Sequence, residues 1–312
     1  MKIYRSLAEV EHNPNSVVTV GTFDGVHLGH AYVLSQLFSI AEAQKGEPTI
    51  VTFHPHPHTV LGGANKKSLT VIDEKLRRLS EYGNARIIAI PFTSTFSRLE
   101  AKTFVGNILC NIIGMKAIVM GFDHGFGKNR AGSIQTVKAL ALENNINVFE
   151  LEQRTIEDRK VSSSRIRQLL RSGQIEEANT LLGYSYSCTG VVVRGAGRGK
   201  KLGFPTANVQ IADDDKLVPG CGVYIVRARI GTKVYNAVAN IGFQPTFNGR
   251  IEVLEVHIIG FESAIYNESL EISFYKKIRD EKKFDTPSEL ICQVKCDKET
   301  AKKYFIDRTK YV

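Results

Sequence analysis

The first half of the chain is organised around the stretch Gly21-Thr22-Phe23-Asp24-Gly25-Val26-His27-Leu28-Gly29-His30. The β-rich run 17–20 precedes this stretch, and apolar residues spaced three and four apart follow it, as on one face of a helix. The stretch is therefore a loop that joins a strand to the start of a helix. Free backbone N–H groups and the helix dipole favour an anion there, so the sequence predicts a loop that binds phosphate.

Glycines and histidines in this loop suit nucleotide chemistry. Gly21 and Gly25 permit turn geometry and a close approach of phosphate to the backbone. His27 and His30 are three apart across Gly29, so both imidazoles can lie on the same side of the first turn. Two imidazole donors would bind a triphosphate and stabilise charge as its α-phosphate is attacked. The alternative is a glycine-rich turn with one histidine as a helix cap and the other at the surface.

Strand-like and helix-like segments alternate in the first half. The strand-like runs are 17–20, 49–53, 86–90, 117–120 and 147–151, and helical segments lie near 73–82, 98–113 and 133–144. Apolar strands separated by helices indicate a parallel sheet covered on both faces. We therefore expect a doubly wound, Rossmann-like α/β domain over residues 1–183, ending in two short helices around Gly173.

The second half has a different pattern. Its strand-like runs are 188–194, 222–230, 233–241, 251–260 and 270–276, followed by an amphipathic helix near 287–305. Successive strands without intervening helices favour a closed or nearly closed antiparallel β-barrel, because closure removes exposed edges. We expect this second domain over residues 188–312, after a hinge near 183–187.

Composition narrows the functional classes. The hydrophobic and charged fractions of the 312 residues, 43% and 23%, are those of a soluble globular protein. No apolar run approaches the roughly 20 residues needed to span a bilayer, and no signal peptide is evident, so a cytoplasmic protein without membrane contact is expected. The net charge of +9 suits anionic ligands but is spread without a polybasic block, which argues against nucleic acid. The five cysteines are scattered and predict neither a metal site nor a disulfide framework.

Four segments of the first half resemble one family. The loop 21–30 looks like the His-x-Gly-His signature of nucleotidyltransferases, in the form found in bacterial FAD synthetases fused to riboflavin kinase. The other three segments are Thr52-Phe53-His54-Pro55-His56-Pro57, Gly121-Phe122-Asp123-His124-Gly125-Phe126-Gly127 with Arg130-Ala131-Gly132, and Val161-Ser162-Ser163-Ser164-Arg165-Ile166-Arg167. The resemblance implies transfer of AMP from ATP to FMN, which yields FAD and pyrophosphate.

The resemblance also assigns residues. His27, His30 and Arg167 would be catalytic, and Asp123, Phe126 and Arg130 would bind the flavin. Gly21, Phe23, Asp24, Gly25, Gly29, His56, Ser162, Ser163 and Ser164 would bind the nucleotide. Physically, the serines precede a predicted helix and can hold phosphate oxygens, and an arginine can neutralise the departing pyrophosphate. Two alternatives remain, a serine-capped helix with exposed arginines and a purely structural turn around His56.

The second half resembles riboflavin kinases. Its glycine-rich basic stretch 195–208 lacks the Gly-Lys-Ser/Thr end of a P-loop, but 202–208 resembles the family's Pro-Thr-Ala-Asn motif, and 240–247 and 254–257 match further segments. The side-chain oxygens of Thr206 and Asn208 are hard ligands suited to Mg²⁺. The resemblance assigns nucleotide binding to Gly199, Lys201, Gly203 and Pro205. Without it, the stretch is a flexible basic loop.

Glu255 is the expected general base of the second half. On a strand, Glu255 and His257 point to one face and Leu254 and Val256 to the other, so an apolar set in the core would turn Glu255 toward a substrate. By resemblance, Glu255 activates the ribityl 5′-hydroxyl of riboflavin. Lys200 and Gly260 depart from the family pattern, where arginine and aspartate are usual.

The resemblance covers roughly residues 15–305 and implies a bifunctional enzyme. Riboflavin, FMN, FAD and ATP are its expected small-molecule partners, and Mg²⁺ its cofactor. We expect a monomer or a weak homo-oligomer. One alternative is an FMN adenylyltransferase whose second half is a weak kinase or a flavin-binding module. Another is a non-catalytic flavin-responsive regulator or an RNA-binding protein.

Overall fold

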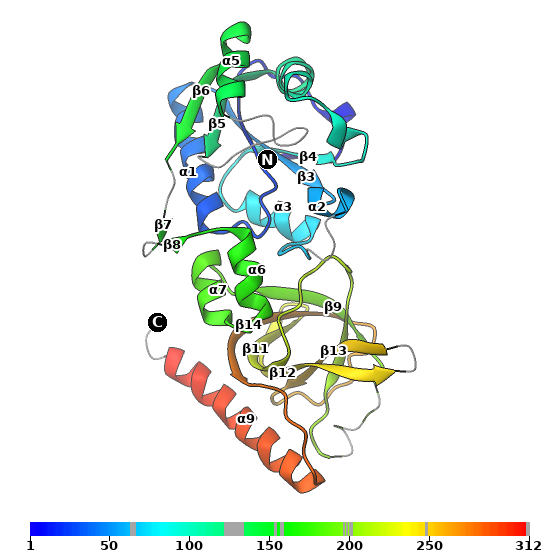
Figure 1. Ribbon diagram of the computed structural model, residues 1–312. Helices are drawn as coiled ribbons and strands as arrows, with labels where there is room; N and C mark the ends of the chain where they lie inside the picture. Colours follow the sequence, from blue (N-terminus) through cyan, green and yellow to red (C-terminus); the bar gives the residue numbers. More distant parts are fainter. Residues whose placement is uncertain are drawn as a thin grey trace. The chain divides into compact units, whose positions relative to one another are not determined.

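The computed structural model in Figure 1 describes most of the chain, namely residues 1–62, 67–121, 134–152, 155–156, 159–195, 197, 199, 202–246 and 249–309. Its internal contacts divide the chain into two units, Met1–Ser163 and Ser164–Val312. Over the described ranges, no helix is long and apolar enough to cross a membrane.

A parallel sheet forms the centre of the first unit, with the strand order β1-β4-β3-β2-β5-β6. The strands are β1 Lys2–Tyr4, β2 Ser16–Val20, β3 Glu47–His54, β4 Arg86–Pro91, β5 Met115–Gly121 and β6 Asn147–Leu151. The five predicted strands are confirmed. The sixth, β1, was not predicted, because three residues with two exposed side chains form no apolar run.

Helices cover both faces of this sheet. They are η1 Leu7–Glu9, α1 Leu28–Ala43, α2 Pro57–Val60, α3 Ile72–Ser80, η2 Phe96–Arg98, α4 Ala101–Thr103, η3 Phe104–Ile113 and α5 Ile134–Asn144. Val17 packs with Leu34 of α1 on one face, and Val18 packs with Leu109 of η3 on the other. This is the doubly wound arrangement that the sequence predicts. The expected helix 98–113 is instead divided, and its longer part, η3, has π-type geometry.

The strand order reverses at β2. β3 and β4 lie on one side of β2, whereas β5 and β6 lie on the other. In open parallel sheets, ligands bind beyond the carboxyl ends of the strands at such a switch point. The loop 21–30 leaves the sheet there, directly after β2.

The second unit begins with two short helices and continues as a closed barrel. α6 Ser163–Arg171 and α7 Ile175–Leu182 flank Gly173, whose φ is 78°. The barrel has the order β10-β13-β12-β11-β14-β9. Its strands are β9 Ser187–Val193, β10 Ala207–Ile211, β11 Gly222–Ile230, β12 Lys233–Thr246, β13 Gly249–Ile258 and β14 Ser269–Arg279. The predicted barrel is confirmed, and β10, which begins inside the glycine-rich stretch 195–208, is the barrel strand that was not predicted.

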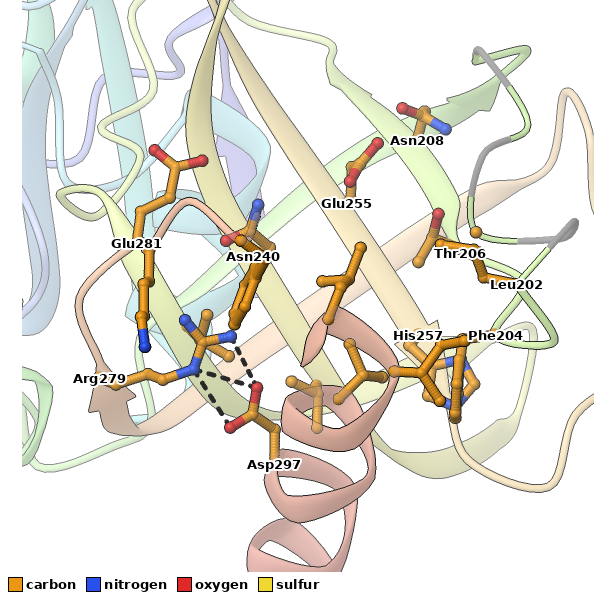
Figure 2. A pocket seen from close by; sticks show the side chains of 18 of the residues that line it. Leu202, Phe204, Thr206, Asn208, Asn240, Glu255, His257, Arg279, Glu281 and Asp297 are labelled. Carbon is orange, nitrogen blue, oxygen red and sulfur yellow. Dashed lines mark hydrogen bonds and ion pairs between the residues drawn. The ribbon is translucent and has the colours of Figure 1, made fainter. Parts of the chain in front are cut away.

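The last helix, α9 Pro287–Thr309, packs on the barrel as expected. Arg279, at the end of β14, binds the Asp297 carboxylate on α9 through Nε at 3.2 Å and Nη2 at 2.8 Å (Figure 2). Asp297 is buried and also accepts a hydrogen bond from Gln293 at 2.9 Å. A buried charge paired in this way fixes the helix against the strand.

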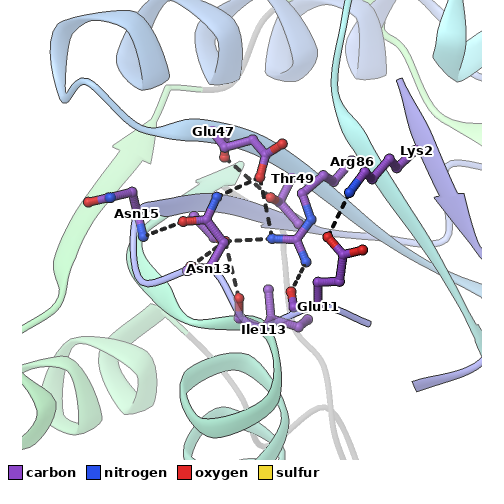
Figure 3. Close-up of polar contacts among 9 residues, drawn as sticks. Lys2, Glu11, Asn13, Asn15, Glu47, Thr49, Arg86 and Ile113 are labelled. Carbon is purple, nitrogen blue, oxygen red and sulfur yellow. Dashed lines mark hydrogen bonds and ion pairs between the residues drawn. The ribbon is translucent and has the colours of Figure 1, made fainter. Parts of the chain in front are cut away.

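A buried arginine joins the amino ends of three strands in the first unit (Figure 3). The Arg86 side chain is 3% exposed. Its Nη1 donates to Ser16 Oγ at 3.1 Å and lies 3.5 Å from Glu47 Oε2, and its Nη2 donates to the Glu11 carbonyl. Asn13 donates to the same Glu47 carboxylate at 2.6 Å. This cluster lies at the opposite edge of the sheet from the loop 21–30, so its contribution is to stability.

Replacing Arg86 tests that contribution. Arg86→Met should lower the free energy of unfolding by about 2–3 kcal/mol, because charge-assisted hydrogen bonds to buried partners are lost. Chemical denaturation of the full chain measures the change. Arg5→Met is the control, since the Arg5–Asp73 pair is exposed on both sides and should contribute well under about 1 kcal/mol. Equal losses in the two variants would contradict the assignment.

Candidate active sites

The loop 21–30 has a strained backbone that buried side chains hold in place. Phe23, Gly25 and Val26 have φ values of 48°, 82° and 34°. Positive φ is unfavourable for the two residues with side chains. Phe23 is fully buried and Val26 is 2% exposed, so apolar burial offsets that cost. The buried side chains therefore hold the loop in this shape.

Asp24 anchors the loop to a distant segment. Its buried carboxylate accepts hydrogen bonds from the Leu69 amide at 2.9 Å and the Thr70 amide at 3.1 Å. The Thr70 hydroxyl in turn accepts a hydrogen bond from the Gly25 amide at 3.1 Å. These contacts position the loop, and the expected contact between Asp24 and a nucleotide stays a prediction.

Lys75 is a second anchor, which the sequence analysis missed. From α3, its buried Nζ donates to the Phe53 carbonyl at 2.8 Å and to the Thr22 carbonyl at 3.2 Å. Burial lowers the pKa of Lys75 to about 8, although the Asp24 carboxylate acts to raise it. A signal was available, since Lys75 shares the apolar face of its helix with Leu76 and Leu79.

The two histidines of the loop are stacked at the start of α1. Their ring centroids are 3.7 Å apart at an interplanar angle of 11°, so both imidazoles do lie on the same side of the first turn. His27 caps α1 and accepts a hydrogen bond from the His30 amide at Nδ1, at 3.3 Å. A neutral His27 therefore carries its proton on Nε2, where it is a donor. The helix-cap alternative thus describes His27 correctly, and the cap fixes the direction of the ring.

Gly29 makes the stacking possible. A Cβ at this position would lie 3.2 Å from the His27 ring and 3.6 Å from the Val161 carbonyl, so a larger residue would crowd both. The serine-rich segment lies against the same loop, because Ser163 Oγ donates to the Asp24 carbonyl at 3.0 Å. His27, His30 and Ser163 are therefore brought together around the loop.

The other candidates of this site are His56, Arg167 and the three residues expected to bind the flavin. His56 caps α2, with Nδ1 accepting from the His58 amide at 3.1 Å. Arg167 is buried in the second unit. Asp123, Phe126 and Arg130 lie outside the described residues, directly after the end of β5. Their assignments stay predictions.

The second unit contains a cavity of about 420 Å³ on the outer face of the barrel wall (Figure 2). The cavity is lined by residues of the glycine-rich loop before β10, of the strands β10 to β14, of the segment after β14 and of α9. Polar lining residues are Thr206, Asn208, Asn240, Glu255, His257, Arg279, Glu281, Lys282 and Asp297.

Strand register aligns the polar residues of the wall. Glu255 on β13 is paired with Asn208 on β10 and with Asn240 on β12. Directly paired residues point to the same face of a sheet, so a carboxylate stands between two amides. Leu254 and Val256 are buried in the core. The expected alternation is confirmed, and Glu255 faces the cavity.

A tight turn brings the glycine-rich loop onto these residues. The Phe204 amide donates to the Gly199 carbonyl at 2.9 Å, and a Cβ on Gly199 would lie 3.2 Å from Thr206 Oγ1. Gly203 has a φ of 82°, and the Pro205 carbonyl bonds to His257. Lys201 lies outside the described residues.

α9 and the segment after β14 add apolar side chains to the lining, which the sequence did not predict. Leu290, Ile291 and Val294 project from α9, beside Phe284. Lys282 lies over the Phe284 ring at 5.7 Å, and the Arg279 guanidinium at 5.8 Å. The cavity thus suits a ligand with a flat apolar ring at one end and hydroxyl or phosphate groups at the other.

These features define a two-domain enzyme of nucleotide chemistry, with a phosphate loop in an α/β unit and a carboxylate-bearing cavity on a barrel. A family model for FAD synthetase matches residues 9–165, and one for riboflavin kinase matches residues 182–305. The chain belongs to the family of bifunctional riboflavin kinase/FMN adenylyltransferases.

Curated relatives match over nearly their full lengths. The bifunctional riboflavin kinase/FMN adenylyltransferase of Bacillus subtilis is 37% identical over 95% of this chain and 94% of its own. The Listeria monocytogenes relative is 37% identical over 93% of each chain, and the Escherichia coli K12 relative is 31% identical over 98% of each.

A solved structure shares the fold. It is titled a macrolide-efflux protein from Streptococcus pneumoniae, and it matches with a TM-score of 0.85 and 31% identity over 96% of this chain and 98% of its own. Its title names transport, whereas both family models name enzymes of flavin synthesis. The likeness therefore supports the two-domain fold, and the activity follows from the family.

Lys75 provides a test of the first site. Lys75→Met keeps the apolar stem but removes the donors to Thr22 and Phe53, so FAD synthesis from FMN should fall by about tenfold or more. Riboflavin phosphorylation should not change, because its site lies in the other unit. Chromatography of the flavins measures both rates, and Lys102→Met, at an exposed lysine, is the control. Wild-type FAD synthesis by Lys75→Met would refute the anchoring role.

Proposed function

We propose that this chain converts riboflavin to FAD in two ATP-dependent steps, each in its own unit. The barrel unit phosphorylates riboflavin to FMN, and the α/β unit transfers AMP from a second ATP to FMN. The observation that carries the proposal is the position of Glu255, facing a cavity between Asn208 and Asn240. A carboxylate in such a row is suited to accept a proton from a bound hydroxyl.

In the kinase step, Glu255 takes the proton from the ribityl 5′-hydroxyl of riboflavin. The hydroxyl oxygen then forms a bond to the γ-phosphorus of ATP, and the bond to ADP breaks. The apolar end of the cavity, around Phe284 and Leu290, receives the flavin ring. Because the ring and the reacting hydroxyl occupy opposite ends, the cavity itself orients the substrate.

Thr206 and Asn208 would hold Mg²⁺ in this step. Their hydroxyl and amide oxygens line the same wall as Glu255 and are hard donors of the kind Mg²⁺ takes. Within the described ranges, no group of three or more His, Cys, Asp or Glu residues could hold a metal. Two neutral oxygens, from Thr206 and Asn208, fit an ion such as Mg²⁺ that keeps water and phosphate as its other ligands. When bound, Mg²⁺ neutralises charge on the ATP phosphates.

In the adenylylation step, an FMN phosphate oxygen attacks the α-phosphorus of ATP, and pyrophosphate leaves. His27 Nε2–H and His30 stabilise the charge on the reacting phosphate, and backbone N–H groups at the start of α1 bind its oxygens. Ser162, Ser163 and Ser164 hold the departing pyrophosphate, with Arg167 as its counter-charge. Asp123, Phe126 and Arg130, which follow β5 in the sequence, are the proposed FMN-binding residues.

The proposal includes Mg²⁺ in both steps, a cytoplasmic location and a monomer or weak homo-oligomer, without nucleic acid or membrane partners.

The second candidate function is an adenylyltransferase with a weak kinase domain, and it is based on Lys200 and Gly260. Gly260 has a φ of 74°, a conformation that glycine adopts without strain. The backbone at 260 therefore suits a glycine, and Lys200 lies outside the described residues.

Two variants test the division of labour. With riboflavin and Mg-ATP, His30→Ala should stop FAD formation but still make FMN, since only the α/β site is changed. Glu255→Ala should lower FMN formation by about 10²-fold or more, the usual contribution of a general base, yet still convert added FMN to FAD. Chromatography of the flavins gives both rates, with Glu262→Ala, at an exposed glutamate, as the control. Loss of both activities in either folded variant would disprove the assignment.

Metal dependence tests Thr206. Excess EDTA should stop both reactions, and added Mg²⁺ should restore them. Thr206→Val preserves the shape but removes one oxygen ligand, so phosphorylation should require about tenfold more Mg²⁺ for half-maximal rate. The Mg²⁺ dependence of FAD synthesis should be unchanged in this variant. An equal shift in both reactions would argue against a metal ligand at Thr206.

A further inference from the structure

His257 is a cavity residue to which neither step above gives a role. It lies two residues after Glu255 on β13 and shares its face of the strand. Its Nδ1 is 2.9 Å from the Pro205 carbonyl. Its ring makes an edge contact with Phe204, with the ring centroids 5.8 Å apart, and Figure 2 shows the two side chains beside each other. Both contacts are with the two residues directly before Thr206.

The contact at Pro205 determines where the imidazole proton sits. A carbonyl oxygen only accepts hydrogen bonds, so Nδ1 must be the donor. Burial lowers the pKa of His257, and Lys298 of α9 lowers it further, although the bond to Pro205 acts in the opposite direction. The ring is therefore neutral, with its proton on Nδ1.

The other ring nitrogen supports the same tautomer. Nε2 is buried and has no hydrogen-bond partner in the described part of the chain. A proton there would leave a buried donor unsatisfied and put a second positive charge near Lys298, both of which are unfavourable. The environment thus selects the form of His257 that donates to the loop.

That hydrogen bond connects two parts of the kinase site. β13 carries Glu255, whereas Pro205 leads into Thr206 and then Asn208 on β10. Gly203 has a positive φ and Gly199 forms the tight turn, so regular strand pairing does not extend through this segment. Ala207 to Val209 pair with β13, but Thr206 is not part of that pairing. The His257–Pro205 bond therefore supplies the connection to β13 just before Thr206.

We propose that His257 is a positioning residue of the kinase site, which holds the segment 204–206 at the β13 wall through its Nδ1–H and so sets the distance between Thr206 and Glu255. This inference rests on the proposed roles of Thr206 and Glu255. His257 acts through the loop and touches neither the transferred phosphate nor the attacking hydroxyl.

Three substitutions test whether His257 acts as a hydrogen-bond donor or only fills space. His257→Asn keeps an N–H at the position of Nδ1. His257→Leu fills space without a donor, and His257→Gln moves the amide toward the position of Nε2. Riboflavin phosphorylation is measured at varied Mg-ATP for kcat and KM, and FAD synthesis from FMN checks folding of the full chain.

The proposal predicts that His257→Asn stays within about threefold of the wild-type KM for Mg-ATP, whereas His257→Leu and His257→Gln raise it about tenfold. FAD synthesis should be unchanged in all three. The proposal is overturned if His257→Leu has a lower KM for Mg-ATP than His257→Asn, or if all three variants have the wild-type KM. It is also overturned if all three lose riboflavin phosphorylation to the same extent. Thr206→Val and Glu255→Gln are assayed alongside. If those two phosphorylate riboflavin normally, the proposed function itself fails, independently of His257.

Discussion

The hydrogen bonds that converge on the buried Asp24 carboxylate are the constraint on which the first site depends. Phe23 and Val26 occupy backbone conformations that cost energy, and an unsupported loop would relax from them. Asp24 binds the backbone of residues 69–70, and Lys75 binds the Thr22 carbonyl in the loop and the Phe53 carbonyl on β3. The loop held in this way leads into α1, where the rings of His27 and His30 stack. The polar residues most deeply buried in this region therefore shape the site.

The second site obtains the same rigidity from a different source. Its Glu255 stands on a barrel strand whose two neighbours present Asn208 and Asn240 by register alone. A one-residue slip would turn all these side chains into the core, so closure of the barrel protects the site. The glycine-rich loop is not paired with a strand, so its position depends on single contacts with the wall, such as the His257–Pro205 bond. α9 completes the far end, fixed by the Arg279–Asp297 pair.

Local patterns in the sequence were enough to predict most of this architecture. Strand–helix alternation predicted the doubly wound sheet, and the Leu254–Glu255–Val256 alternation predicted the face of Glu255. Elements without a strong local pattern were missed. β1 has three residues, and the first two residues of β10 are the last two of the motif 202–208. The π-type geometry of η3 leaves little trace in apolar spacing, because only its hydrogen-bond pattern differs from that of an α-helix.

The partners of residues that act through tertiary contacts could not be found from the sequence alone. The apolar face of α3 indicates that Lys75 is buried, but its partners Thr22 and Phe53 are defined only once the sheet has formed. Arg279 and Asp297 are separated by a turn and half a helix, and His257 meets Pro205 across 52 positions of chain. In each case the partner is defined by packing. The residues nearest the chemistry were recognisable because their types recur in short motifs, whereas their supports do not.

A mixing experiment tests the central claim, that one chain carries two separate sites connected by FMN, most directly. A variant disabled only at His30 is combined with a variant disabled only at Glu255, and the mixture receives riboflavin and Mg-ATP. The account predicts that FMN accumulates first and that FAD then appears after a lag, because each protein supplies the step the other lacks. FMN that accumulates without conversion to FAD, although the Glu255 variant remains folded, would contradict it.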